Sequence, residues 1–166
     1  MIEGVERVGL GGGCHWCTEA VFQSLEGVDR VEQGWIRSVP PHESESEAVV
    51  VHFRPDVIPL DTLIEVHLLT HASTSAHAMR DKYRSAVYTV GDEQRERARR
   101  ALDRLSEEHR ERYVTEALPF AGFRLNDEDY LDYYRTRPDA PFCQTYISPK
   151  LRALRERYGE RVRPDV

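Results

Sequence analysis

The pattern of apolar and polar positions predicts strands and a helix in the first third of the chain. Residues 5–10 alternate in the manner of a strand, and residues 15–25 place apolar side chains at helical spacing. A period of two returns over residues 28–36, before a loop rich in proline and serine over 37–45. The run 47–53 is the most strand-like of the chain because it is apolar and β-branched, so we expect it at the centre of a sheet.

The rest of the chain predicts further helices and strands in irregular alternation. Helices are expected at 60–68, 92–113, 127–135 and 148–158, and strands at 83–90 and 114–118. Asn126 and Ser148 stand where N-caps of the last two helices belong. Because the runs 28–36 and 47–53 follow one another without a helix between them, mixed strand pairing follows. We predict an α+β two-layer sandwich, with helices on a mixed, mostly antiparallel sheet, formed as one domain by residues 1–166.

Composition and charge narrow the possible partners. A chain of 166 residues can bury one core without disulfides. Its formal net charge is −6, from 29 acidic and 23 basic side chains, which disfavours nucleic acid or an anionic membrane as the main partner. No run approaches the roughly 18 apolar residues of a membrane span, and the first residues lack the basic and apolar regions of a signal peptide. We therefore expect a cytoplasmic monomer.

The stretch Gly11-Gly12-Gly13-Cys14 places a thiol where a helix is expected to begin. Consecutive glycines permit a tight turn and a close approach to a ligand. At a helix start, unpaired backbone N–H groups and the helix dipole stabilise an anion, so a thiol there ionises more readily. Cys14 is therefore predicted to be a functional cysteine.

Cys14 and Cys17 form a C-x-x-C pair, for which the residues alone leave three interpretations open. One is a redox pair in which the first thiolate attacks and the second resolves. Another is half of a zinc site, although the chain offers no second pair of ligands at similar spacing. In the third, Cys17 is only a small buried hydrophobe on an amphipathic helix. Glu19, on the same helix, is expected at the surface or as a capping residue, without a role.

Motifs along the chain resemble those of the methionine sulfoxide reductase A family. The stretch from Gly11 to Cys17 resembles the family's G-C-F-W signature. The other matching stretches, in the order of the family, are Gly34-Trp35, Ser46-Glu47-Ala48-Val49, Tyr83-Arg84-Ser85-Ala86, Asp132-Tyr133-Tyr134, Phe142-Cys143-Gln144 and Ile147 to Leu151. The resemblance covers nearly the whole chain. It implies a ferredoxin-like α+β core and the thiol-dependent reduction of the S epimer of methionine sulfoxide, free or in proteins.

The resemblance also implies roles for individual residues. A sulfoxide sulfur is a poor electrophile until its oxygen is protonated or hydrogen-bonded, so a thiolate and a proton donor must act together. Cys14 is expected to attack the sulfur and Glu47 to act as the acid, which requires a poorly solvated carboxyl. Tyr83 is expected to donate a hydrogen bond to the oxygen.

The substrate wall and the later steps follow from the same resemblance. Trp16 and Trp35, with His15 beside them, are expected to line the pocket for the methyl group. Cys14 would become a sulfenic acid, resolved by Cys143 in a C-terminal segment over about 137–166, with Cys17 as the alternative. Thioredoxin is the expected reductant, with no bound cofactor or metal.

The chain departs from the family pattern at several places, which include Trp35 in place of a family tyrosine and a short loop over 37–45. His15 replaces the phenylalanine of the signature, and it makes that part of the pocket titratable near neutral pH. The loop between residues 71 and 83 is shortened and lacks the family's aspartate, for which Asp81 is a possible substitute. These changes motivate a second hypothesis, a thiol-based redox sensor or binding module on the same fold, with a structural zinc site as a distant third.

Overall fold

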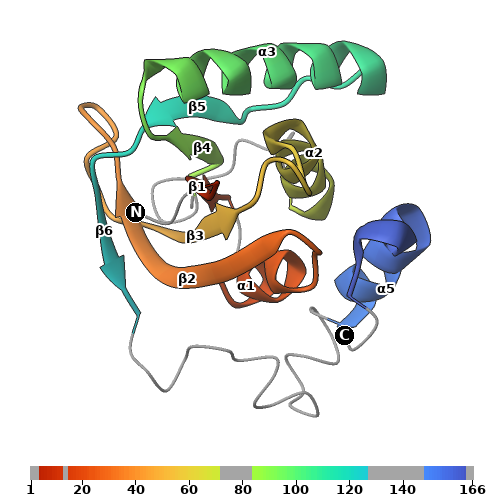
Figure 1. Ribbon diagram of the computed structural model, residues 1–166. Coiled ribbons are helices and arrows are strands. Elements are labelled where there is room, and N and C mark those ends of the chain that lie inside the picture. Colours follow the sequence, from red (N-terminus) through yellow and green to blue (C-terminus); the bar gives the residue numbers. More distant parts are fainter. Residues whose placement is uncertain (1–3, 13–14, 72–83, 127–147, 164–166) are drawn as a thin grey trace.

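The computed structural model describes residues 4–12, 15–71, 84–126 and 148–163 (Figure 1). Its elements are, in chain order, β1 (Glu6–Gly11), α1 (His15–Gln23), β2 (Val28–Arg37), β3 (Ser46–Phe53), α2 (Leu60–Thr70), β4 (Ala86–Thr89), α3 (Asp92–His109), β5 (Glu116–Pro119), β6 (Gly122–Leu125), α5 (Ser148–Tyr158) and a final 3-10 turn, η3 (Gly159–Arg161). The strands form one six-stranded sheet in the order β5-β4-β1-β3-β2-β6. Only β4 and β5 pair in parallel among these strands. The predicted α+β class with a mixed, mostly antiparallel sheet is confirmed.

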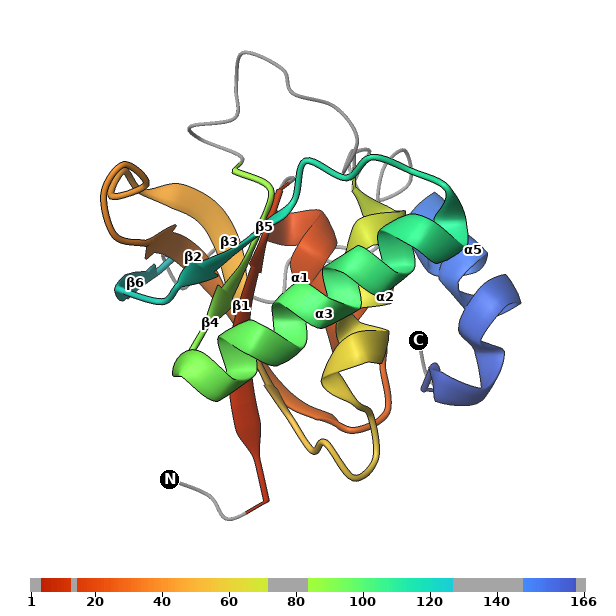
Figure 2. The same cartoon turned by 90° about the horizontal axis from the view of Figure 1, so that it is seen from above.

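The central strand is β3, as its apolar and β-branched residues predicted. It pairs along its length with β1 on one side and β2 on the other. Its alternate residues Val49, Val51 and Phe53 are fully buried in the main core, which side chains of α1, α2, α3 and α5 complete. Figure 2 shows these helices together on one side of the sheet. We call this side the helix face and the other the open face.

The open face carries a second, smaller cluster. Ala48 of β3 and Tyr88 of β4 lie there with Ile36, Ala86, Leu118 and the partly buried Phe120 and Phe123. Every strand contributes alternate residues to the two faces. The helix face, on which the helices pack, holds the larger core, and the open face holds a thinner apolar layer.

Two predicted elements differ from the structure by more than two residues at one end, and one strand was missed. The helix expected over 92–113 ends at His109, because Arg110 adopts a left-handed conformation with φ of 54° and caps the helix with its backbone N–H. The strand expected over 83–90 is shorter and begins at Ala86. Strand β6 was not predicted at all, although it pairs with β2 along four residues. The helix expected over 127–135 lies outside the described residues.

The last described residues pack against the segment between α1 and β2. Val162 forms an isolated antiparallel bridge with Leu25. The N–H of Arg163 donates to the carbonyl oxygen of Ser24 over 2.7 Å, and its guanidinium donates to that of Val28. The tail therefore closes the connection between α1 and β2.

A partly buried carboxylate joins α2, α3 and α5. The hydroxyl of Tyr158 in α5 donates to Glu65 of α2 over 2.5 Å, and His109 of α3 donates to the same carboxylate over 3.2 Å. The hydroxyl of Tyr113 lies 2.6 Å from the other ring nitrogen of His109. We call Glu65, His109, Tyr113 and Tyr158 the Glu65 cluster.

Of the helices in the described part of the chain, none combines the length and apolar character needed to cross a membrane.

The Glu65 cluster shifts the pKa values of its members in opposite directions. Burial alone would raise the pKa of Glu65, but the hydrogen bonds from Tyr158 and His109, with the nearby charge of Arg157, outweigh it and lower that pKa. Burial and the hydrogen bond to Glu65 raise the pKa of Tyr158 to about 12. The cluster is therefore most stable with Glu65 ionised.

We predict that Glu65→Gln lowers the free energy of unfolding at pH 7 by about 1–2 kcal/mol, because charge-assisted hydrogen bonds are lost. The folded-state pKa of Glu65 lies below 4.5, its ordinary value, so the stabilisation is present above pH 4.5 and is lost as the pH falls further. Denaturant titrations between pH 3 and 7 measure the difference. The exposed Glu96, paired with Arg100, is the matched control, and Glu96→Gln should cost less than about 0.5 kcal/mol. A difference that stays constant with pH would contradict this account.

Candidate active site

The end of β1 leaves little space for a side chain at Gly11. A Cβ there would lie 3.1 Å from the carbonyl oxygen of Glu47 in β3 and 3.1 Å from that of Arg84 before β4. Gly12 has a φ of +143°, and a Cβ on it would come within 2.5 Å of the ring of His71. The glycines preceding Cys14 thus let the backbone pass between close neighbours, although Gly11 belongs to the strand rather than to a turn.

The carboxyl of Glu47 is buried beside this strand end. Glu47 is the second residue of β3 and is 5% exposed, so it is not a solvated strand end. It pairs directly with Trp35 of β2, which places both side chains on the same face of the sheet. This is the helix face, because Val49 and Val51 alternate with Glu47 from the same strand. Trp35 is half-buried and has the guanidinium of Arg124 5.6 Å from its ring centroid.

A buried arginine holds the start of β4 against the start of β3. The backbone N–H of Arg84 donates to the hydroxyl of Ser46 over 2.8 Å. Its guanidinium donates to the hydroxyl of Tyr88 over 2.9 Å and to the carbonyl oxygen of Ser44 over 3.1 Å. Burial raises the pKa of Tyr88 despite the charge of Arg84. Arg84, which follows Tyr83 in the sequence, is therefore hydrogen-bonded to Ser46, which precedes Glu47.

Two histidines of α2 also reach the end of β1, and neither was singled out in the sequence as a site residue. His67 is buried and its Nε2 lies 2.7 Å from the carbonyl oxygen of Gly11. His71 follows the helix and its Nε2 lies 2.8 Å from the hydroxyl of Ser85. Their spacing of four residues was the available signal, because it places both side chains on one face of a helix.

Helix α1 contains two buried residues of contrasting chemistry. Cys17 is buried at 4% exposure, as the interpretation of a small buried hydrophobe requires. Glu19 is 2% exposed, so the first of its two expected places, at the surface, was wrong. Both carboxyls, Glu19 and Glu47, are therefore enclosed in the helix side of the fold.

Comparison with known proteins decides the family. The model of the family described as peptide methionine sulfoxide reductase matches residues 6–162. The chain belongs to this family. Among curated members, peptide methionine sulfoxide reductase MsrA 1 of Rhodopirellula baltica is 33% identical, over 96% of this chain and 91% of that protein. The MsrA of Deinococcus radiodurans is also 33% identical, over 95% of this chain and 84% of that protein.

Solved structures with the same fold include a methionine sulfoxide reductase A and yeast Mxr1. Methionine sulfoxide reductase A of Corynebacterium diphtheriae superposes with a TM-score of 0.70 at 24% identity, covering 84% of this chain and 78% of that one. Reduced Mxr1 from Saccharomyces cerevisiae superposes with a TM-score of 0.71 at 19% identity, covering 86% and 91%. A further structure, of Mxr1 in complex with Trx2, has a TM-score of 0.61 at 17% identity and covers 78% and 85%.

Within this reductase fold, the predicted site residues divide into two groups. The structure brings Glu47 and Trp35 together beside the end of β1 and buries Cys17 in α1. Outside the described residues lie Cys14, Tyr83, Cys143 and Asp81, together with the side chains of His15 and Trp16.

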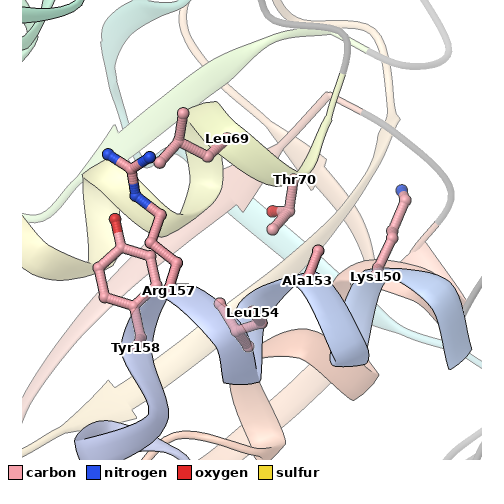
Figure 3. Close-up of a pocket in the computed structure, with 7 residues that line it drawn as sticks. All are labelled: Leu69, Thr70, Lys150, Ala153, Leu154, Arg157 and Tyr158. Atoms are coloured by element: carbon pink, nitrogen blue, oxygen red, sulfur yellow. The ribbon is translucent and has the colours of Figure 1, made fainter.

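A cavity of about 290 Å³ lies between the end of α2 and α5 (Figure 3). It is lined by Leu69, Thr70, Lys150, Ala153, Leu154, Arg157 and Tyr158, none of which is a predicted site residue. Among the side chains that the structure describes, no three of His, Cys, Asp and Glu gather as metal ligands would.

We predict that Ser46→Ala destabilises the reductase fold by about 1–3 kcal/mol, because the buried N–H of Arg84 loses its acceptor. Ser44→Ala is the matched control. Its hydroxyl accepts only a long 3.3 Å contact from Arg84, whose bond to the Ser44 carbonyl remains. Thermal unfolding of both variants measures the difference. Equal effects would show that the Ser46 hydroxyl does not hold the start of β4.

Proposed function

We propose that this single domain reduces the S epimer of methionine sulfoxide, in proteins or as the free amino acid, with Cys14 as the nucleophile. The observation that carries the proposal is the position of Glu47. A buried carboxyl lies beside the strand end that leads into Cys14, within a chain of the peptide methionine sulfoxide reductase family. A thiol and a water-shielded acid in one region are what sulfoxide reduction needs.

The proposed reaction begins at the sulfoxide sulfur. The thiolate of Cys14 attacks the sulfur, and Glu47 gives its proton to the sulfoxide oxygen. The sulfur–oxygen bond of the substrate breaks as the oxygen passes to Cys14, so methionine leaves and Cys14 becomes a sulfenic acid. The Tyr83 hydroxyl donates a hydrogen bond to the oxygen as charge develops there. Asp81 is a weaker candidate for the carboxylate that the shortened loop lacks.

The substrate methyl group is proposed to rest against aromatic side chains. Trp35 supports this role because it is the direct cross-strand neighbour of Glu47 and is half-buried on the same face. Trp16 and His15 belong to the first turn of α1, immediately after the proposed nucleophile. His15 makes this wall more polar than the family's phenylalanine does.

Regeneration requires a second thiol. We propose that Cys143 condenses with the sulfenic acid, forming a disulfide and releasing water, after which thioredoxin reduces the disulfide. The burial of Cys17 in α1 favours Cys143 over Cys17 as the resolving residue. Yeast Mxr1, which has the same fold as this chain, has been solved in complex with Trx2, and this supports thioredoxin as the reductant. No bound cofactor is needed, because the electrons come from thiols.

We predict that Cys14→Ser abolishes the reduction of a methionine S-sulfoxide by the NADPH, thioredoxin reductase and thioredoxin system. Glu47→Gln should lower kcat/KM by about 10²- to 10⁴-fold, because the proton donor is lost. The R epimer is the substrate control and should not be turned over. A wild-type protein that shows no turnover, but whose Cys14 is oxidised and reduced reversibly, would support the redox sensor instead.

We predict that Cys143→Ser supports one round of reduction and then stops with thioredoxin, because the sulfenic acid cannot be resolved. Cys17→Ala should continue to turn over, since the buried thiol is not required. Single-turnover and steady-state assays with the same substrate compare the two. If Cys17→Ala stops after one round and Cys143→Ser does not, the resolving residue is Cys17.

A further inference from the structure

Helix α2 anchors the last residue of β1 through His67. Because a carbonyl oxygen can only accept, the Nε2 of His67 donates to the carbonyl oxygen of Gly11, over 2.7 Å. His67 is 2% exposed, so this hydrogen bond is shielded from water. The ring of His71, one turn further, stacks on that of His67 with centroids 4.2 Å apart and planes 28° apart. The two rings form one rigid unit against the end of β1.

The ring of His71 lies against Gly12, the residue that follows Gly11. A Cβ on Gly12 would lie 2.5 Å from Cδ2 and 2.7 Å from Nε2 of His71. On another side it would lie 3.2 Å from the Cα of Ser85. His71 and Ser85 therefore enclose the backbone of Gly12 from two sides, and a hydrogen bond joins them to each other.

Hydrogen bonds fix the ring of His71 on both sides. Its Nδ1 donates to the carbonyl oxygen of His67. Its Nε2 lies 2.8 Å from the hydroxyl of Ser85, which in turn lies 2.6 Å from the hydroxyl of Thr115. This series of hydrogen bonds connects the end of α2 to the residues just before β4 and β5, which pair in parallel.

The hydroxyl chain accommodates either charge state of His71. When the ring is neutral, Ser85 donates to Nε2 and accepts from Thr115. When the ring is protonated, Nε2 donates to Ser85, which then donates to Thr115. Because both hydroxyls can reverse their direction, the ring keeps its place whether or not it carries a charge.

We propose that His71 is a positioning residue that fixes Gly12 and, through it, the cysteine two residues further along. The kinetic part of this role rests on the proposed function, whereas its effect on the thiol does not. A displaced Cys14 loses its alignment with the substrate sulfur and the N–H groups at the helix start that stabilise a thiolate. His71 thereby acts through the backbone rather than by touching the substrate.

The test uses His71→Phe, which keeps a ring in place but removes both hydrogen bonds. In a Cys17→Ala and Cys143→Ser background, Cys14 is the only thiol of the three, so its rate of alkylation by iodoacetamide against pH reports its ionisation. We expect His71→Phe to move the midpoint of this profile upward by about half a pH unit or more. In the chain with all its cysteines, kcat should fall about tenfold or more while KM changes less than about twofold.

Further variants separate positioning from a general loss of stability. Ser85→Ala removes the partner of Nε2 and should shift both readouts in the same direction but less. His71→Gln retains a group that can donate to or accept from Ser85, and it should recover part of the loss. His109→Phe is the matched control, because it also removes two partly buried hydrogen bonds of a histidine, in the Glu65 cluster. It should leave the alkylation profile and kcat unchanged, with unfolding curves recorded for every variant.

A wild-type alkylation profile in His71→Phe would overturn the proposal, and so would equal shifts in His71→Phe and His109→Phe. Failure of the proposed function gives a different result. In that case the unmodified chain does not reduce the sulfoxide, yet the alkylation profiles of the variants still show whether His71 positions Cys14.

Discussion

Close neighbours surround the backbone at the end of β1, so that a side chain at Gly11 would be crowded and one at Gly12 would clash. Gly11 lies between the carbonyl oxygens of Glu47 and Arg84, and Gly12 lies between His71 and Ser85. The geometry of the candidate site depends on this constraint. Because the strand is confined by its neighbours, the residues that follow start from a fixed point, and the buried acid on β3 has a fixed relation to that point.

Strong local patterns made much of the fold predictable. The centre of the sheet was visible in the β-branched run of β3, and the extent of α5 was visible in its cap and proline. What failed were features set by distant partners or by single dihedral angles. Strand β6 has only four residues and depends on pairing with β2, while α3 ends early because Arg110 turns left-handed, which its residue type does not indicate.

The candidate site was predictable to the extent that chemistry requires it. Sulfoxide reduction demands an acid shielded from water, and the burial of Glu47 agrees with that demand. No comparable chemical reason predicted the burial of Glu19, which the polar positions of α1 alone suggested for the surface. The histidines of α2 show another difficulty. Their spacing of four is visible in the chain, but the carbonyl group that His67 binds belongs to a residue 56 positions earlier.

The contact between the C-terminal tail and the segment after α1 affects the order in which the molecule can be completed. Arg163 binds a carbonyl group 135 residues earlier, that of Val28, and Val162 bridges to Leu25. During synthesis on the ribosome, α1 emerges long before residues 162–163, so the connection that follows it gains these partners only after the strands and helices in between have been made. The connection after α1 therefore stays without these contacts while the strands of the sheet can already pair.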